Sequence, residues 1–224
     1  MSFLEANFKN DLDQIFLSNS STEVNNRKPG KRKMIRLFAA IPIPAEISEF
    51  LYNLHQPMPN ARWIEPRDYH LTLCFVGDID NRIASEFADQ LSRIEMNPFP
   101  LKISALDVFG GNDPHVLWAG LAPSTELDDL QRKIKRAAHS IGLEPDTKPF
   151  KPHITLARLR NAPTIAIERL IRQHVALTSP AFTVDHFALY SAKPRTGGGP
   201  YVIEERFPLL PGLMLEDEDE YDYS

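Results

Sequence analysis

Cysteine and long hydrophobic runs are the features that this chain of 224 residues most clearly lacks. Cys74 is its single cysteine, so no disulfide can join two parts of the chain, and we expect a cytoplasmic protein. No apolar stretch approaches the ~20 residues that a membrane helix needs, so we expect no membrane partner. The first residues also lack a basic start followed by an apolar core, so we expect no secretion signal.

Metal-binding motifs are missing as well. The chain contains neither His-Glu-x-x-His nor Cys-x-x-Cys, two spacings that bring metal-ligating side chains together. The motif described below offers a threonine hydroxyl, a poor zinc ligand, where a second histidine or a carboxylate would be needed. We therefore expect a protein that uses neither a metal nor another cofactor.

Negative charge is concentrated near the C-terminal end of the chain. Six acidic residues lie close together there: Glu216, Asp217, Glu218, Asp219, Glu220 and Asp222. The formal net charge of the whole chain is −5, so the remainder without these six carries +1. A body so close to neutrality can hold one oligonucleotide end, but it cannot coat a long duplex.

Composition and periodicity divide the chain into three parts. Residues 1–33 are predicted to form a helix and then a basic linker, because five apolar residues stand at helical spacing: Leu4, Phe8, Leu12, Ile15 and Phe16. Residues 34–212 carry a regular succession of strand and helix patterns, which predicts the folded domain. Residues 213–224 are predicted to be a disordered acidic tail.

The patterns within residues 34–212 occur in the same order twice. A first strand over 34–43 is followed by the predicted order helix, strand, helix, strand, strand, over residues 44–56, 68–77, 81–96, 100–110 and 115–121. The same order then recurs over residues 124–142, 153–159, 164–175, 181–191 and 201–209. An internal repeat of a whole unit predicts two similar lobes that face each other across a shared cleft.

Each half contains a histidine that is followed two residues later by a threonine in an apolar strand. The first copy reads "HLTL" from His70, and the second reads "HITL" from His153. Random placement of the histidines and threonines predicts roughly 0.3 His-x-Thr triplets in such a chain, so two matching copies call for a cause. We expect the two motif strands to meet at the cleft and to deliver their histidines to one site.

Alternate side chains of a strand share a face, so each motif strand presents its polar side chains together. Strict alternation places three side chains of each strand toward the cleft: His70, Thr72 and Cys74 in the first, and His153, Thr155 and Ala157 in the second. The opposite set, which includes Phe75 and Arg158, is then expected to point into the core. A strand that ends or twists before Arg158 would release it from the core.

The residues expected at the cleft are suited to chemistry at phosphorus. Two imidazoles that titrate near neutrality can act as a general base and a general acid in one site. Two threonine hydroxyls can donate hydrogen bonds to anionic oxygens between them. A Cys74 thiol nucleophile is the alternative, but a small buried side chain is the better interpretation because no base is dedicated to it.

Four stretches of the sequence resemble landmarks of the two-histidine (2H) phosphoesterases: "RLFAAIPIP", "RWIEPRDYHLTLCFVGDI", "VLWAGL" and "PFKPHITLAR". Within that superfamily the chain is similar to the bacterial and archaeal RNA 2′,3′-cyclic phosphodiesterases, also called 2′-5′ RNA ligases. The resemblance runs from Met34 to Leu210. It implies an α+β fold with two lobes, in which two pseudo-symmetric antiparallel sheets with outer helices surround a central groove.

The same resemblance implies roles for five residues of this chain. His70 is expected to be the proton donor and His153 the proton acceptor, while Thr72, Thr155 and Arg158 are expected to bind the phosphate. Arg158 matches a basic residue that the family often carries five places after the second histidine. The implied reaction is a metal-independent hydrolysis of RNA 2′,3′-cyclic phosphate ends to a 2′-phosphomonoester.

Other functions stay open at this point. The substrate could instead be a small cyclic nucleotide or an ADP-ribose cyclic phosphate. The same groove could bind RNA ends or join them by 2′-5′ ligation, or the first helix could be an interaction segment. The paired histidines favour an enzyme, because binding alone requires no proton donor and acceptor. We expect a monomer whose partners are RNA 3′ ends with a cyclic phosphate, or small cyclic phosphates.

Overall fold

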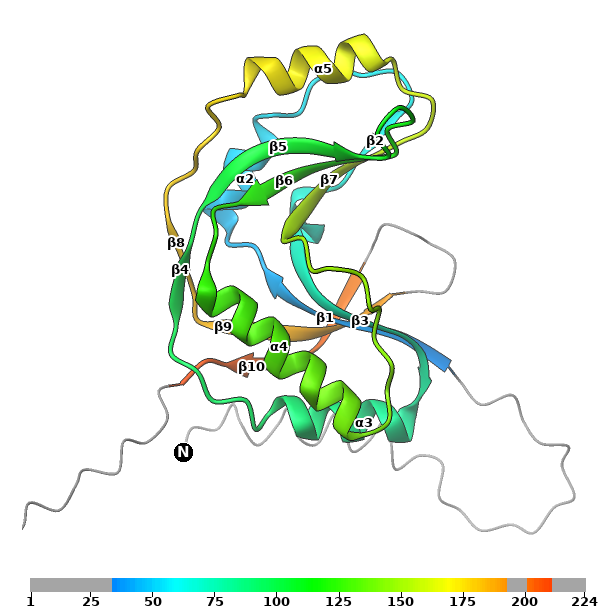
Figure 1. Cartoon of the computed structure of the whole chain (residues 1–224), viewed down its shortest axis with the longest axis vertical. Coiled ribbons are helices and arrows are strands. Elements are labelled where there is room, and N and C mark those ends of the chain that lie inside the picture. The colour runs from blue at the N-terminus through cyan, green and yellow to red at the C-terminus, as the bar shows by residue number, and fades with distance from the viewer. Residues whose placement is uncertain (1–33, 193–200, 211–224) are drawn as a thin grey trace, which may run out of the picture. The chain divides into compact units, whose positions relative to one another are not determined.

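A computed structural model describes residues 34–192 and 201–210 of the chain (Figure 1). These residues form ten strands: β1 (Met34–Pro42), β2 (Ala61–Trp63), β3 (His70–Asp80), β4 (Phe99–Leu101), β5 (Ile103–Phe109), β6 (Val116–Leu121), β7 (His153–Leu159), β8 (Phe182–Val184), β9 (His186–Ala192) and β10 (Tyr201–Pro208). Four α-helices and one short 3₁₀ helix accompany them: α2 (Ala45–Tyr52), α3 (Asn81–Leu91), α4 (Thr125–Ser140), α5 (Thr164–Gln173) and η1 (Pro66–Asp68). The predictions for the N-terminal helix, its linker and the acidic tail lie outside the described residues.

The strands pair antiparallel, as the α+β interpretation requires. Seven of them form one path in the order β10-β9-β1-β3-β7-β6-β5, and β2 adds to β7. The two halves of this path meet at a single register pair, Leu71 with Ile154. Both side chains are fully buried. The predicted pair of antiparallel sheets is therefore joined into one sheet of two halves, with the two motif strands β3 and β7 adjacent at the junction.

The spatial lobes are not the two halves of the sequence, which corrects the simple interpretation of the repeat. Strands β5 and β6 come from the first half but lie next to β7, the motif strand of the second half. Strands β9 and β10 come from the second half but lie next to β1 and β3. Each half of the sequence therefore sends its last two strands to the opposite lobe.

The two segments of chain that cross between the lobes pair with each other. Strands β4 and β8 lie in the segments that cross, and they form a separate two-stranded antiparallel sheet. Each crossing also interrupts a predicted strand. The strand predicted over 100–110 is divided at Lys102, and the one predicted over 181–191 is divided at Asp185. The short strand β2 had no counterpart in the sequence pattern.

The helices begin and end where side chains or backbone groups satisfy their terminal hydrogen-bonding groups. Asp80 caps α3 by accepting a hydrogen bond from the Ile83 N–H at 3.0 Å. Helix α4 ends at Ser140, and Gly142 (φ 77°) turns the chain out of it two residues later, where the Leu143 N–H donates to the Ala138 carbonyl at 3.0 Å. Gly142 was predicted to stop this helix, and that prediction is confirmed.

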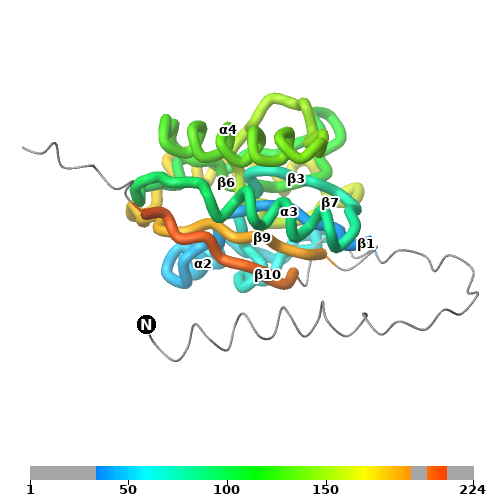
Figure 2. Tube along the Cα trace, turned by 90° about the horizontal axis from the view of Figure 1, so that it is seen from below, coloured from blue at the N-terminus to red at the C-terminus, as the bar shows by residue number. Residues whose placement is uncertain are grey.

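Helices α3 and α4 pack against each other and against β3. The same arrangement is visible from both directions (Figures 1 and 2), and α5 lies toward the other end of the sheet. A large apolar cluster extends under both lobes, and a smaller one on the other face of the β1–β9 pair joins four residues: Phe38, Ala40, Ala188 and Tyr190. None of the described helices is long and apolar enough to cross a membrane.

Candidate active site

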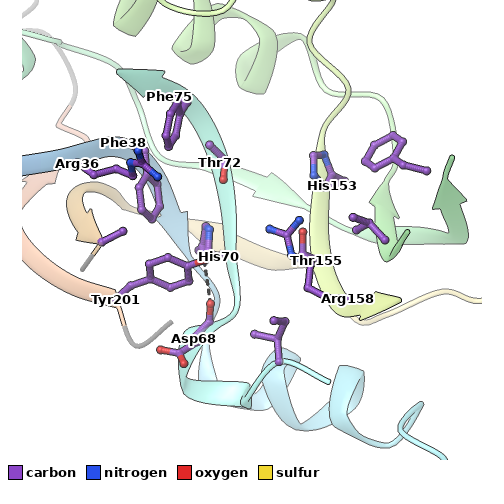
Figure 3. Close-up of a pocket in the computed structure, with 14 residues that line it drawn as sticks. Arg36, Phe38, Asp68, His70, Thr72, Phe75, His153, Thr155, Arg158 and Tyr201 are labelled. Atoms are coloured by element: carbon purple, nitrogen blue, oxygen red, sulfur yellow. Dashed lines mark hydrogen bonds between the residues drawn. The ribbon is translucent and has the colours of Figure 1, made fainter. Parts of the chain in front are cut away.

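The two motif strands open onto one pocket of about 310 Å³, where β3 and β7 lie side by side (Figure 3). The lining includes all five residues singled out from the sequence: His70, Thr72, His153, Thr155 and Arg158. Their side chains face one another from the two lobes (Figure 3). The prediction that both histidines meet at one cleft is therefore realised in the structure, while their catalytic roles stay a prediction.

A β-bulge in strand β3 changes which side chains enter this pocket. Thr72 pairs with Ala40 and Cys74 pairs with Ala39, so Leu73 between them is an extra residue without a partner. The extra residue shifts the alternation by one. Cys74 is consequently buried, and Phe75, with 46 % of its surface exposed, lines the pocket. The expectation from strict alternation is wrong for both residues.

Strand β7 contains the same irregularity at the same place in its motif. Thr155 pairs with Trp118 and Ala157 pairs with Leu117, which leaves Leu156 as the extra residue. Ala157 is fully buried, contrary to the expectation from strict alternation. Arg158 is exposed and lines the pocket, so the irregularity required for a phosphate-binding role is present. Arg158 and Phe75 thus occupy equivalent positions in the two strands.

Each candidate histidine is held by a hydrogen bond from its Nδ1 to the backbone carbonyl of the residue two places upstream. His70 Nδ1 lies 2.8 Å from the Asp68 carbonyl oxygen, and His153 Nδ1 lies 2.7 Å from the Lys151 carbonyl oxygen. A carbonyl only accepts, so Nδ1 must carry the proton in both rings. In the neutral tautomer Nε2 is then left with a free lone pair, which is the form that a general base needs.

His70 stands in an aromatic environment on its side of the pocket. Its ring centroid lies 5.0 Å from Phe38, 5.7 Å from Tyr190 and 4.8 Å from Tyr201. Burial lowers the pKa of His70. The hydrogen bond to the Asp68 carbonyl and the Asp68 carboxylate raise this pKa, whereas the charges of His153 and Arg158 lower it.

His153 is also packed by aromatic rings, but its charged neighbours differ. Its ring centroid lies 4.9 Å from Phe109 and 6.0 Å from Trp118. Burial lowers the pKa of His153, the hydrogen bond to the Lys151 carbonyl raises it, and the positive charges of Arg158 and Lys151 lower it. Arg158 lowers both pKa values, so the charged neighbours differ in Lys151 beside His153 and in the Asp68 carboxylate, which partly supports protonation of His70.

The lining also includes Arg36, Phe38 and Tyr201, which the sequence patterns did not single out. Phe38 and Tyr201 contact the His70 ring, and Arg36 makes a bidentate ion pair with Asp78 through hydrogen bonds of 3.0 and 2.7 Å. Arg36 and Phe38 belong to the "RLFAAIPIP" stretch, whose likeness to the family was the available signal. No signal in the sequence indicated Tyr201, because its position at the pocket depends on the long-range pairing of β10 with β9.

The structure argues against the thiol alternative. Cys74 is buried, and burial raises the pKa of its thiol to about 11. At neutral pH it is therefore a thiol rather than the thiolate that attacks. Among the described residues, no three histidine, cysteine, aspartate or glutamate side chains are grouped so that they could hold a metal ion.

Comparison with known proteins agrees with this geometry. The profile of the "2′-5′ RNA ligase superfamily" matches residues 55–195, which include both motifs and more than half of the chain. The chain belongs to this superfamily. The resemblance to 2H phosphoesterases that the sequence predicted is thereby confirmed.

Eight curated relatives carry the name "RNA 2′,3′-cyclic phosphodiesterase". The Aquifex aeolicus protein is 28% identical over 185 residues, which cover 79% of this chain and 98% of the relative. The Thermotoga maritima protein is 30% identical, with coverages of 70% and 87%. The Geobacillus stearothermophilus protein is also 30% identical and covers 70% of this chain, but the match spans only about half, 52%, of that relative.

Solved structures of the superfamily confirm the fold. Escherichia coli LigT, complexed with 3′-AMP, aligns with a TM-score of 0.62 and 28% identity over 79% of this chain and 98% of LigT. A Thermus thermophilus protein aligns with a TM-score of 0.65 at 24% identity, over 78% of this chain and 97% of its own. The predicted α+β fold with two lobes is therefore confirmed.

Proposed function

We propose that the protein is an RNA 2′,3′-cyclic phosphodiesterase that hydrolyses cyclic phosphate ends to 2′-phosphomonoesters. The observation that carries the proposal is the pair of imidazoles, His70 and His153, which face one pocket with Nδ1 fixed by a backbone carbonyl in each. The names of the curated relatives support the substrate class. The family and the geometry thus point to the same reaction.

The proposed reaction is one in-line displacement at phosphorus. His153 Nε2 takes a proton from a water molecule, and the water oxygen forms a bond to phosphorus while the bond from phosphorus to O3′ breaks. Protonated His70 gives its Nε2 proton to the departing O3′. One water is consumed, the 2′-oxygen keeps the phosphate, and the proton lost by His70 is balanced by the one that His153 gained.

The charges around the two rings support this choice of acid and base. Lys151 favours neutral His153, which a base requires, whereas Arg158 lowers the pKa of both rings. The Asp68 carboxylate favours protonated His70, which an acid requires, although burial acts against the charge in both rings. The bound phosphate anion adds a negative charge beside both imidazoles and raises their pKa values, so that His70 takes up from solvent and holds the proton that it later donates.

The remaining site residues would hold the phosphate. Thr72 and Thr155 can each donate a hydroxyl hydrogen bond to a non-bridging oxygen, one from each side of the pocket. Arg158 can donate a charge-assisted bond that strengthens as charge builds up on these oxygens. The proposed cycle assigns a role to every polar group of the doubled motif and uses no metal or cofactor.

Turnover of a defined substrate tests the proposal. Purified protein is incubated with a short RNA that ends in a 2′,3′-cyclic phosphate, with and without excess EDTA, and the product is identified by chromatography against 2′- and 3′-phosphate standards. The expected result is a 2′-phosphate product at an unchanged rate in EDTA. No turnover, or loss in EDTA with rescue by a divalent ion, contradicts the proposal; a 3′-phosphate product reverses only the acid and base assignment.

Two further expectations belong to this proposal. We propose that the enzyme acts as a monomer, because both histidines and both threonines of the site come from one chain. We also propose a cytoplasmic location, which the single buried cysteine supports. Light scattering of the purified protein and fractionation of the source cells check these two points.

A further inference from the structure

A second hollow adjoins the catalytic pocket on the side of His153. It has a volume of about 610 Å³ and is bounded by β3, α4 and the segment 145–151. Thr72, Phe75, Phe109 and His153 line both spaces, so the two are continuous. We call this hollow the lysine groove, after the three lysines in its lining: Lys135, Lys148 and Lys151.

The charge of the lysine groove is positive. Its lining holds three ammonium groups and one carboxylate, Asp146, whose Oδ2 lies 3.5 Å from Lys148 Nζ. Lys151 Nζ lies 3.8 Å from Asp107 Oδ2, so the charges of Lys148 and Lys151 are partly compensated. Lys135 is half-buried beside the cysteine thiol and helps to lower the pKa of Asp146. The excess of cations suits a polyanionic ligand.

Aromatic side chains are interleaved with these cations. Phe75, Phe109 and Phe150 line the lysine groove. Phe75 is unusually exposed for a phenylalanine, because the bulge in β3 turns it out of the core at the position that Arg158 has in β7. Exposed aromatic faces next to cations are the combination that binds single-stranded nucleic acid, through base stacking and phosphate contacts.

We propose that the lysine groove binds the nucleotides on the 5′ side of the cyclic phosphate end, with Lys135 on a phosphodiester and Phe75 stacked on a base. This inference rests on the proposed function. When the cyclic phosphate lies between His70 and His153, the 5′ oxygen of the same nucleoside carries the rest of the strand out of the pocket. The continuous groove gives that strand a path whose charge and apolar surface match it. The substrate class is then an RNA oligonucleotide rather than a cyclic mononucleotide.

The experiment compares kcat/KM for two substrates with the same terminal base. One is a 2′,3′-cyclic mononucleotide, and the other is a tetranucleotide that ends in the same cyclic phosphate. The wild-type protein is expected to prefer the tetranucleotide by at least about tenfold, the size of one stacking contact. Lys135→Ala is expected to reduce this preference about fivefold and Lys135→Arg to retain it. Phe75→Leu is expected to reduce it about tenfold.

A matched control is available on the same helix. Lys133 is also half-buried on α4, but its Nζ lies 3.4 Å from the Glu95 carbonyl, outside the lysine groove. Lys133→Ala is expected to leave both rates unchanged. A salt titration adds a second readout, because loss of one phosphate contact reduces the slope of log(kcat/KM) against log[salt] for the tetranucleotide by about 0.7.

Three outcomes would overturn the inference. A wild-type protein that treats both substrates alike has no 5′ site. Equal losses on both substrates in Lys135→Ala would place the terminal nucleotide itself in the lysine groove. A gain on both substrates in that variant would indicate that the acidic segment 216–222 occupies it.

Failure of the proposed function would look different. In that case neither substrate turns over, but binding of a labelled tetranucleotide with a 2′-phosphate end can still be measured by fluorescence anisotropy. The inference expects Lys135→Ala, but not Lys133→Ala, to weaken this binding. Equal binding by both variants and the wild type would reject it.

Discussion

At the scale of single residues, the two imidazoles are positioned by backbone rather than by side chains. The carbonyl of the residue two places upstream holds Nδ1 in each case, Asp68 for His70 and Lys151 for His153. No side-chain substitution at those two positions removes these hydrogen bonds. Substitutions of Asp68 or Lys151 therefore change the charge next to a ring while its tautomer is kept, which makes them clean electrostatic probes.

Removal of either imidazole is expected to abolish most activity without unfolding the protein. Proton transfer by one positioned group is typically worth about 10²–10⁴-fold in rate, so His70→Ala and His153→Ala should each lose that much in kcat. Thr72→Ala and Thr155→Ala should lose less, because each removes one hydrogen bond to phosphate. Steady-state kinetics on the tetranucleotide that ends in a 2′,3′-cyclic phosphate measures these losses. His139→Ala, an exposed position on α4, is the control, and near-full activity of either catalytic variant would remove that residue from the mechanism.

Arg158 is expected to act through its charge and its fork of donors. A hydrogen bond between charged groups contributes about 1.5–3 kcal/mol, so Arg158→Ala should lower kcat/KM by roughly 10–100-fold. Arg158→Lys should recover part of the loss, because it restores the charge but not the bidentate geometry. Arg160→Ala is the matched control, since this exposed arginine lies two residues further along. Equal activity of the Arg158 and Arg160 variants would leave Arg158 without a role at the phosphate.

The residues of the doubled motif were accessible from sequence because the repetition itself carries the information. One His-x-Thr triplet is unremarkable, whereas two in equivalent places of a repeated unit indicate a common site. Phe38 and Tyr201 could not be found in this way. Their contacts with His70 depend on which strands pair across the sheet, and that is a long-range property that local patterns do not contain.

At the scale of elements, the two bulges explain where alternation failed. Leu73 and Leu156 are each followed by another small or apolar residue, Cys74 and Ala157. Both members of each pair are compatible with burial, so the hydrophobic pattern is the same with or without an extra residue. Only the charge of Arg158 indicated that the alternation had to shift, and it did so in one strand only.

The exchange of strands between lobes could not be predicted for a similar reason. Periodicity shows which face of a strand is buried, but it does not show which strand lies beside it. The order of helices and strands was correct in both halves, while the neighbours of β5, β6, β9 and β10 were not. Once the chain crosses twice between lobes, the crossing segments β4 and β8 can pair and split two predicted strands.

The junction between the lobes is expected to be sensitive to cavities. Leu71 is fully buried and forms, with Ile154, the register pair that joins β3 to β7. Leu71→Ala should lower the free energy of unfolding by about 2–5 kcal/mol, the usual cost of such a truncation in a core. Denaturant unfolding followed by circular dichroism measures it. Ile165→Ala, at a position with 81% of its surface exposed, should change the stability by less than about 0.5 kcal/mol, and a similar small change in Leu71→Ala would mean that the junction carries little of the stability.

At the scale of the whole molecule, the candidate active site lies where the two lobes meet. Each lobe supplies one imidazole, one threonine and one set of aromatic rings, but the charged neighbours differ between them. Arg158 lowers both pKa values, so the difference in charge rests on the Asp68 carboxylate beside His70 and Lys151 beside His153, and it favours His70 as the acid and His153 as the base in the proposed cycle.

The pH dependence of the rate tests this asymmetry. Burial lowers the pKa of both histidines in the free protein, so the optimum of kcat/KM is expected below the ordinary imidazole value of about 6.5. The rate should rise with pH as His153 loses its proton and fall as His70 loses its own. The profile of kcat should lie at higher pH, because the bound phosphate anion raises both pKa values. An optimum of kcat/KM well above neutrality would contradict the depressed values.

Two substitutions then assign the limbs of the profile to the two rings. Lys151→Met removes a cation that lowers the pKa of His153, so the acidic limb should move to higher pH. Asp68→Asn removes a carboxylate that raises the pKa of His70, so the alkaline limb should move to lower pH. Both variants keep the backbone carbonyl that holds the ring, and profiles of kcat/KM on the cyclic mononucleotide provide the measurement. If Lys151→Met moves the alkaline limb instead, His153 has the higher pKa, which contradicts the order that the charges around the two rings predict.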